Sequence, residues 1–162
     1  MPDSNRKKIK DQQKGEFLTA AGMTDVASTV NEMHEETFIF DVPADAAVAE
    51  IGITILKACK LKSVKGLAIT GLAANGSAYI TQTVSKRDGA GGAAVIAATF
   101  NTNTAGQNKA ITAWVPYDFT LSSTTANLFF AAGNVLTFLS AETSTPTTPI
   151  AKIAVTVEYG VV

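Results

Sequence analysis

The stretch Ile153-Ala-Val-Thr-Val-Glu-Tyr159 decides the fold class of this chain. Branched and aromatic side chains occupy every second position, and small or polar residues occupy the positions between them. Because successive side chains of a β-strand point to opposite faces of a sheet, this alternation predicts a strand with one face in a hydrophobic core.

Similar runs recur at short intervals from Thr37 onward, between turn-forming residues. No intervening segment is long enough for the helices of β-α-β units, so the sequence predicts an all-β, jelly-roll-like antiparallel β-sandwich of about eight strands. The expected strand segments are Thr37–Val42, Ile51–Ile55, Leu61–Thr70, Tyr79–Lys86, Ala94–Phe100, Ala110–Val115, Tyr117–Leu121, Leu128–Phe130, Val135–Ala141 and Ile153–Tyr159.

Turn signals separate these runs. Asn75-Gly76 predicts a type I′ hairpin, because both central residues of that turn need positive φ. The glycine-rich Asp88–Gly92 predicts a second hairpin, and Gly133-Asn134 predicts a turn before the last two strands, which form a closing hairpin or a Greek-key pair. Asn101–Lys109 and Glu142–Pro149 are expected to be polar loops.

Residues 1–36 differ in composition from residues 37–162 and are predicted to form an N-terminal arm. The first fifteen residues are polar and basic, and cannot bury enough apolar surface to fold alone. Apolar residues spaced three to five apart then predict a short amphipathic helix over Thr24–Glu36. The basic cluster has three interpretations: a solvated tail, a nucleic-acid contact, or a tether to an acidic protein surface.

Composition limits the classes of partner. Hydrophobic residues make up 46% of the 162 residues and charged residues only 17%, below the ~25% typical of soluble domains. The net charge of −1 gives no general attraction to nucleic acid, which is therefore not expected as a partner. No apolar run is long enough to span a bilayer, and no secretory signal core is seen at the start, so synthesis in a cytoplasm is expected.

Groups for catalysis are sparse, and the chain is predicted not to be an enzyme. One cysteine, Cys59, and one histidine, His34, give no disulfide, no cysteine-based zinc site and no recognisable nucleophile pair, so no metal or cofactor is expected. Cys59 is expected to be a small buried apolar residue. Asp41 and Asp45 resemble a carboxylate pair but suit a strand exit better.

Two further patterns have a structural and a functional interpretation. Asp88–Gly92 lacks the Gly-Lys-Ser/Thr ending and the following helix of a phosphate-binding loop, which favours a hairpin. Trp114 is one aromatic residue, too few for a sugar-stacking platform, and is expected to fill the core.

The region from Thr37 to Val162 resembles the β-sandwich decoration, or cement, proteins that bind the outside of tailed-bacteriophage capsids. The resemblance rests on Phe38-Ile-Phe-Asp-Val-Pro43, the lysine-punctuated strands around Lys57–Lys65, the threonine-rich Tyr79–Lys86 and the turn Ala132–Leu136. It implies a shell-stabilising homotrimer on the capsid exterior of the virion. It also implies that the N-terminal arm contacts the major capsid protein and that there are no catalytic residues.

The expected partner-binding residues of the arm combine the basic cluster with apolar side chains. They are Arg6, Lys7, Lys8, Lys10, Phe17, Leu18, Met23 and Met33. The alternative is a head-fibre or tail-tip module that binds a receptor or carbohydrate, since it would share the strand pattern and the polar loops. A metal-dependent jelly-roll enzyme would need two or three histidines, and the sequence has one.

Overall fold

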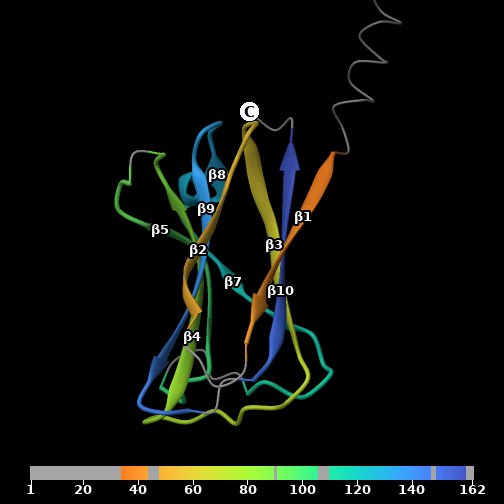
Figure 1. Ribbon diagram of the computed structural model, residues 1–162, viewed down its shortest axis with the longest axis vertical. Helices are drawn as coiled ribbons and strands as arrows, with labels where there is room; N and C mark the ends of the chain where they lie inside the picture. The colour runs from red at the N-terminus through yellow and green to blue at the C-terminus, as the bar shows by residue number, and fades with distance from the viewer. Residues whose placement is uncertain (1–33, 44–47, 90, 106–109, 147–148, 160–162) are drawn as a thin grey trace, which may run out of the picture. The chain divides into compact units, whose positions relative to one another are not determined.

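The computed structural model describes residues 34–43, 48–89, 91–105, 110–146 and 149–159. The chain divides into two compact units, Met1–His34 and Glu35–Val162. All the described strands belong to the second unit, which is a β-sandwich of two antiparallel sheets (Figure 1).

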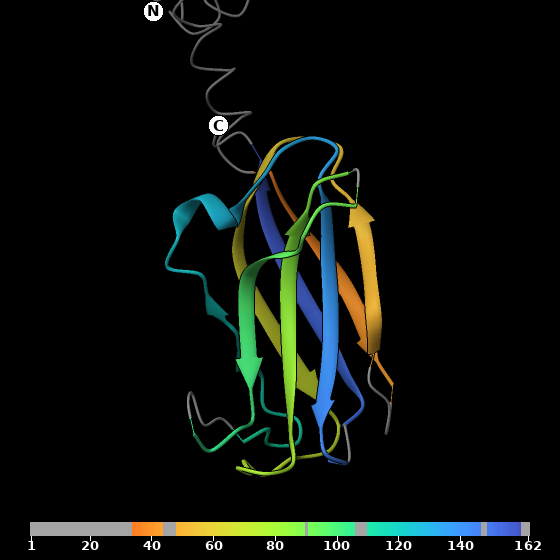
Figure 2. The same cartoon turned by 90° about the vertical axis from the view of Figure 1, so that its left-hand side faces the viewer.

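Sheet A has the strand order β1-β10-β3-β6, with β8 also paired to β3, and sheet B has the order β2-β9-β4-β5-β7. Figure 2 looks onto sheet B, where β5, β4, β9 and β2 lie side by side in front of sheet A. The elements are β1 (Glu35–Val42), β2 (Val48–Thr54), β3 (Cys59–Ala68), β4 (Tyr79–Arg87), β5 (Val95–Asn101), β6 (Tyr117–Asp118), β7 (Thr120–Leu121), the 3₁₀ helix η1 (Thr125–Leu128), β8 (Phe129–Phe130), β9 (Val135–Thr143) and β10 (Ala151–Tyr159).

The strands pair as they would in one long antiparallel hairpin whose two arms are then folded into two layers. β1 pairs with β10, β2 with β9, β3 with β6 and β4 with β5, all antiparallel. Successive strands, the short ones included, alternate between the sheets except at the β4–β5 hairpin, which is the topology of a jelly roll. The predicted fold class is confirmed.

The core lies between the two sheets and is filled by the alternating apolar residues that defined the strands. Phe40 of sheet A stacks on Phe138 of sheet B with ring centroids 5.6 Å apart. A second aromatic cluster joins Phe100 to Tyr117 and Phe119, at centroid distances of 4.4 and 5.7 Å. Offset and tilted ring pairs of this kind stabilise a core beyond the area they bury.

The predicted Asn75-Gly76 hairpin is wrong. The strands on either side of it, β3 and β4, belong to different sheets, and Gly76 is not among the residues with positive φ. The Asn75 side-chain oxygen instead accepts hydrogen bonds from the backbone N–H groups of Ser77 and Ala78, at 2.8 and 3.1 Å. Asparagine builds such Asx turns as readily as it enters a type I′ turn, so the local signal did not determine the turn type.

The predicted hairpin at Asp88–Gly92 is confirmed by the pairing of β4 with β5. Gly91 has φ +81°, which only glycine adopts at little cost. The turn before β9 is also confirmed, with Gly133 at φ +88°. The strands after that turn, β9 and β10, lie in different sheets, so they form the Greek-key arrangement and not a closing hairpin.

Three predicted segment boundaries need correction. Glu35 and Glu36, the end of the helix predicted over Thr24–Glu36, belong instead to β1, and the Glu36 carboxylate accepts a hydrogen bond from the Tyr159 hydroxyl at 2.6 Å. Residues 24–33 of that prediction lie outside the described residues. Tyr117–Leu121 is split into β6 and β7, because the chain crosses there from sheet A to sheet B. Ala110–Val115 is not a strand: it forms a single bridge, between Ile111 and Leu72.

Candidate interaction surfaces

The arm residues expected to bind a partner lie outside the described residues. They are Arg6, Lys7, Lys8, Lys10, Phe17, Leu18, Met23 and Met33. The candidate sites among the described residues lie in the sandwich.

Cys59, at the start of β3, has 0% of its surface exposed, which confirms that it is a buried apolar residue. Burial, with a smaller effect from the nearby negative charge of Glu36, raises the pKa of its thiol to about 11. A nucleophilic or metal-binding cysteine needs the thiolate form and access to solvent. Cys59 in this environment has neither.

The remaining chemical candidates in the described residues are engaged in structural roles. Asp41 forms an exposed ion pair with Lys152 across the β1–β10 pair at 2.5 Å, and Asp45 lies outside the described residues. Within the ranges that the structure describes, no cluster of three or more His, Cys, Asp or Glu residues could hold a metal ion. No helix in the same ranges is long and apolar enough to cross a membrane.

Trp114 sits in a tightly bonded loop at one end of the sandwich. Its backbone N–H donates to the carbonyl of Ala68 at 2.8 Å, immediately beyond the β3–β6 pairing. Ile111 anchors the same loop: its side chain is buried, and its backbone exchanges two hydrogen bonds with Leu72, both of 2.8 Å. The two segments can approach this closely because Gly71 has no side chain. A Cβ atom at that position would lie 3.0 Å from the Ile111 carbonyl oxygen.

The prediction that Trp114 fills the core is wrong, because 69% of its surface is exposed. Its backbone φ is +59°, a conformation that is unfavourable for a bulky residue. Bulky residues in this conformation persist only where the surrounding structure imposes them, and they concentrate at functional sites. Trp114 is therefore the residue of the sandwich that most needs a functional explanation.

Other exposed apolar side chains lie on the segments next to Trp114. Ile69 continues β3 outward, and its N–H donates to the carbonyl of Ile150 at 3.0 Å, so the segments carrying these residues are adjacent. We call this group the Trp114 patch. Its members, with their exposed fractions, are Leu67 (41%), Ile69 (39%), Trp114 (69%), Val115 (50%) and Ile150 (44%).

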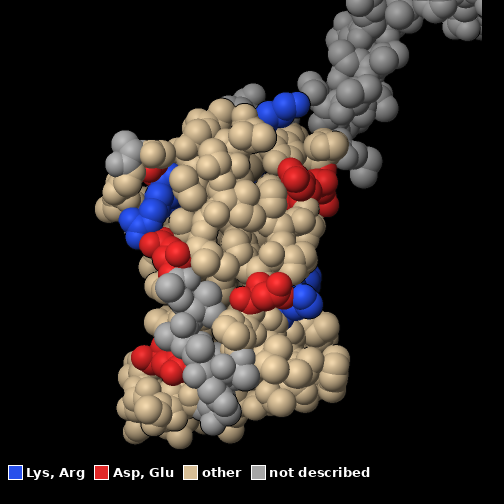
Figure 3. Space-filling model, viewed as in Figure 1, with Lys and Arg blue, Asp and Glu red and all other residues tan. Residues whose placement is uncertain are grey.

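The loops at this end of the molecule carry no charge in their described parts. Residues 69–78, 102–105, 110–116, 144–146 and 149–150 contain no Asp, Glu, Lys or Arg. Figure 3 shows the corresponding lower end of the sandwich as almost entirely uncharged on the visible face. Leu67 lies opposite Lys152 at the edge of the group, and the other members lie in or beside the uncharged loops. Exposed apolar side chains next to an uncharged surface are typical of a protein interaction site.

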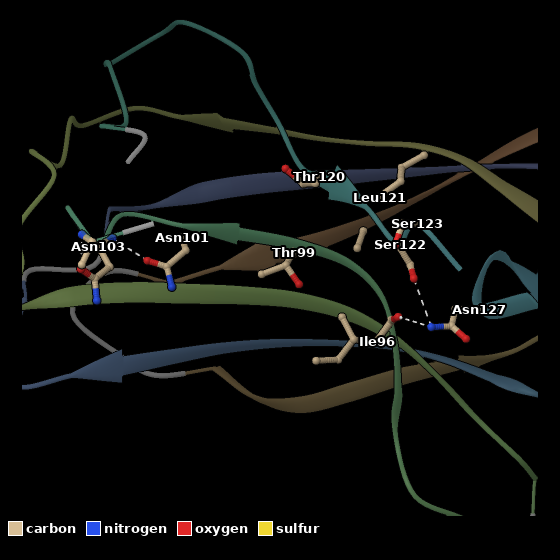
Figure 4. A pocket seen from close by; sticks show the side chains of 11 residues that line it. Ile96, Thr99, Asn101, Asn103, Thr120, Leu121, Ser122, Ser123 and Asn127 are labelled. Carbon is tan, nitrogen blue, oxygen red and sulfur yellow. Dashed lines mark hydrogen bonds between the residues drawn. The ribbon is translucent and has the colours of Figure 1, made fainter. Parts of the chain in front are cut away.

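A second feature is a groove of about 540 Å³ beside β5 and β7 (Figure 4). Among the residues that the structure describes, no charged side chain and no aromatic ring lines it. The lining residues are Ile96, Ala98, Thr99, Asn101, Asn103, Ala105, Thr120, Leu121, Ser122, Ser123 and Asn127.

Several polar groups of this groove already bond to one another. The Asn127 amide nitrogen donates to the Ser122 hydroxyl at 3.1 Å and to the Ile96 carbonyl at 3.4 Å, which leaves its carbonyl oxygen as an acceptor. The Asn101 side-chain oxygen accepts from the N–H of Asn103, and its nitrogen donates to Thr81. The groove therefore presents a neutral surface whose polar side chains are largely held in place by hydrogen bonds to neighbouring protein groups.

Sequence reasoning missed the Trp114 patch because its members come from three separate parts of the chain. Local hydrophobicity at Trp114 and Val115 predicted a buried strand, since apolar residues are buried by default. Only the absence of strand pairing around residues 112–116 places these side chains in solvent. No known protein family model matches the chain, and no curated protein matches it in sequence.

Proposed function

We propose that the chain is a non-enzymatic structural protein of a phage virion that binds the outer surface of the capsid and stabilises the shell. The observation that supports this most directly is the Trp114 patch, an exposed apolar surface at the end of the sandwich where backbone hydrogen bonds hold the Trp114 loop. The proposal also rests on the resemblance of the strand pattern to capsid decoration proteins.

The physical basis is that such a surface is favourable to bury. Its described loops carry no charge that would have to be desolvated, and tryptophan is the residue type most enriched among energetic hot spots of interfaces. The hydrogen bonds of Trp114 and Ile111 hold the loop in place before binding, so little conformational entropy is lost on docking. A protein that binds only the assembled shell stabilises it by mass action.

In this proposal the N-terminal arm supplies a second contact with the major capsid protein. The arm adds contact area after the sandwich docks, with its basic cluster acting as a tether. Two linked contacts raise the overall affinity because the second binding step becomes intramolecular.

We further propose that copies of the chain associate as a homotrimer, through the outer face of sheet B. Neighbouring residues across this face form the uncharged row Leu139, Thr83, Thr99 and Thr120. Light scattering on the purified chain and on the occupied capsid tests this association. A monomer in solution that also sits singly on the shell contradicts it.

The experiment on the main proposal is co-sedimentation of the purified chain with empty capsids of the phage that encodes it. We expect Trp114→Ala to weaken binding by at least tenfold, as for an interface hot spot. The matched control is Leu56→Ala, because Leu56 is 84% exposed and precedes the start of β3, whereas the patch lies at the other end of that strand, roughly 30 Å away at ~3.3 Å per residue. Equal binding by the native chain and both variants overturns the proposal.

A binding module for a neutral, hydroxyl-rich ligand such as a glycan is the second candidate function. The groove beside β5 and β7 favours it, because two residues of the predicted polar loop, Asn101 and Asn103, line that groove. A glycan array with the native chain and Asn103→Ala tests it. Capsid binding without glycan binding supports the capsid-decoration role. Glycan binding without capsid binding supports the receptor- or carbohydrate-binding module.

A further inference from the structure

Two buried polar side chains lie on neighbouring strands inside the sandwich, and each has one polar atom with no hydrogen-bond partner in the described structure. Gln82 of β4 and Ser140 of β9 both have 0% of their surface exposed. Within the described structure, neither the Gln82 amide nitrogen nor the Ser140 hydroxyl has a hydrogen-bond partner. Leaving such a group unsatisfied in a core is unfavourable, so native proteins rarely do so.

The two residues are direct cross-strand neighbours in the β4–β9 pairing. Directly opposed residues of an antiparallel pair point to the same face, with Cβ atoms about 5 Å apart. Gln82 stands two positions from buried Ile80 and Val84, and Ser140 stands two positions from buried Phe138, so both side chains lie on the core face of sheet B.

A third polar group approaches from the opposite sheet. The Tyr117 hydroxyl of β6 donates to the Gln82 side-chain oxygen at 3.1 Å. Reversing the Gln82 amide exchanges its donor and acceptor but still leaves one of them without a partner. The hydroxyl oxygen of Tyr117 also retains the capacity to accept a hydrogen bond.

We propose that a single ordered water molecule binds between Gln82 and Ser140 and bridges the two. It accepts a hydrogen bond from the Gln82 amide nitrogen and bonds to the Ser140 hydroxyl, with the Tyr117 hydroxyl as a third partner. Buried waters are held by about three such bonds to otherwise unsatisfied polar groups. The polar contact between the sheets then consists of Tyr117, Gln82, this water and Ser140, and it favours one alignment of the sheets, which apolar contacts alone define less sharply.

The first test requires no mutation. A high-resolution crystal structure of the full chain is expected to show a solvent peak about 2.7–3.2 Å from both the Gln82 amide nitrogen and the Ser140 hydroxyl. An empty core at this point, or a direct bond between the two side chains, overturns the proposal.

The second test is a double-mutant cycle with Gln82→Met and Ser140→Ala, read from unfolding equilibria. Each single change is expected to raise the unfolding constant about tenfold, because it removes one of the partners of the water. If the two effects were independent, the double variant would have an unfolding constant about a hundredfold above that of the native chain. We expect a much smaller rise, because both changes remove the same water. The control pair, Ser140→Ala with Ile80→Val, shares no polar partner and is expected to give the product. Independent effects of Gln82 and Ser140 contradict a bridging water.

Discussion

The ring of Tyr117 occupies the space next to Gly66 that a side chain would otherwise fill. The two residues are cross-strand partners of β6 and β3, and a Cβ atom at Gly66 would come within 2.1 Å of the ring. The ring can therefore extend across sheet A, contact Phe100 and reach Gln82 of the opposite sheet with its hydroxyl. A missing side chain at one position thus determines the placement of a buried aromatic residue at another.

Gly66→Ala is accordingly expected to destabilise the sandwich by about 1–3 kcal/mol, the range for overpacking a close-packed core. Chemical denaturation measures the change. Gly92→Ala is the matched control, since a Cβ there meets atoms no closer than 3.4 Å and φ is not positive. Similar small effects of both substitutions would mean that the Tyr117 ring moves aside easily.

The Cys59 thiol is expected to resist modification in the native protein. Its burial and its raised pKa, about 11, keep it protonated and shielded at pH 8. Labelling with a thiol reagent should therefore follow the rate of opening of the fold, and denaturant should accelerate it strongly. Cys59→Ser is expected to lower stability by about 1–3 kcal/mol through a buried hydroxyl while leaving capsid binding intact. Rapid labelling of the native chain contradicts this description of the site.

The ion pair between Glu50 and Arg87 is expected to make stability depend on pH. The bidentate hydrogen bonds from Arg87, at 2.8 and 2.6 Å, together with one from Thr137, lower the pKa of Glu50 below its usual 4.5. A lowered pKa in the folded state means that this stabilisation is complete above pH 4.5 and is lost as the pH falls through the folded value.

Glu50→Gln is therefore expected to be less stable than the native chain at pH 7 and to approach it in stability below pH 4.5. Arg87→Lys, which keeps the charge but loses the two-pronged geometry, is expected to fall between them. Thermal unfolding across pH 3–7 measures the series. A difference that stays constant with pH indicates that the carboxylate charge plays no part.

Trp114→Gly and Trp114→Ala are expected to differ in stability although both remove the indole. Glycine adopts a φ near +59° freely, whereas alanine retains the strain, so the glycine variant should be more stable by about 1 kcal/mol. Both should lose capsid binding equally if the indole is the contact. Greater stability of the alanine variant in denaturant titrations would show that the loop relaxes to a different conformation.

Removal of the arm is expected to leave the melting temperature of the sandwich unchanged only if the cut precedes β1. A chain starting at Glu35 keeps the full β1–β10 pairing, whereas one starting at Thr37 loses the Glu36–Tyr159 hydrogen bond and two paired positions. We expect the first to retain the melting temperature of the intact chain and to bind capsids more weakly, and the second to melt at a lower temperature. Full capsid occupancy by the first truncation would show that the arm makes no essential contact.

Particular segments explain which elements were predictable. Ile153–Tyr159 alternates strictly and lies within β10. Leu61–Thr70 is rich in apolar residues, although its buried positions shift by one between Ser63 and Val64, and β3 covers most of it. Thr24–Glu36 has a helical apolar spacing, but Glu35 and Glu36 join β1 because pairing with β10 and the bond to Tyr159 outweigh a weak local preference. Asn75-Gly76 is compatible with more than one turn, and its neighbours in space decide which one forms.

The sequence by itself determined that the chain from about residue 37 is a sandwich of alternating strands with few groups for chemistry, because alternation and composition are local properties. Only the tertiary structure decided which strands pair, that Trp114 faces solvent, and that Gln82 and Ser140 meet in the core. Those outcomes depend on contacts between residues far apart in the chain, and no local pattern specifies them.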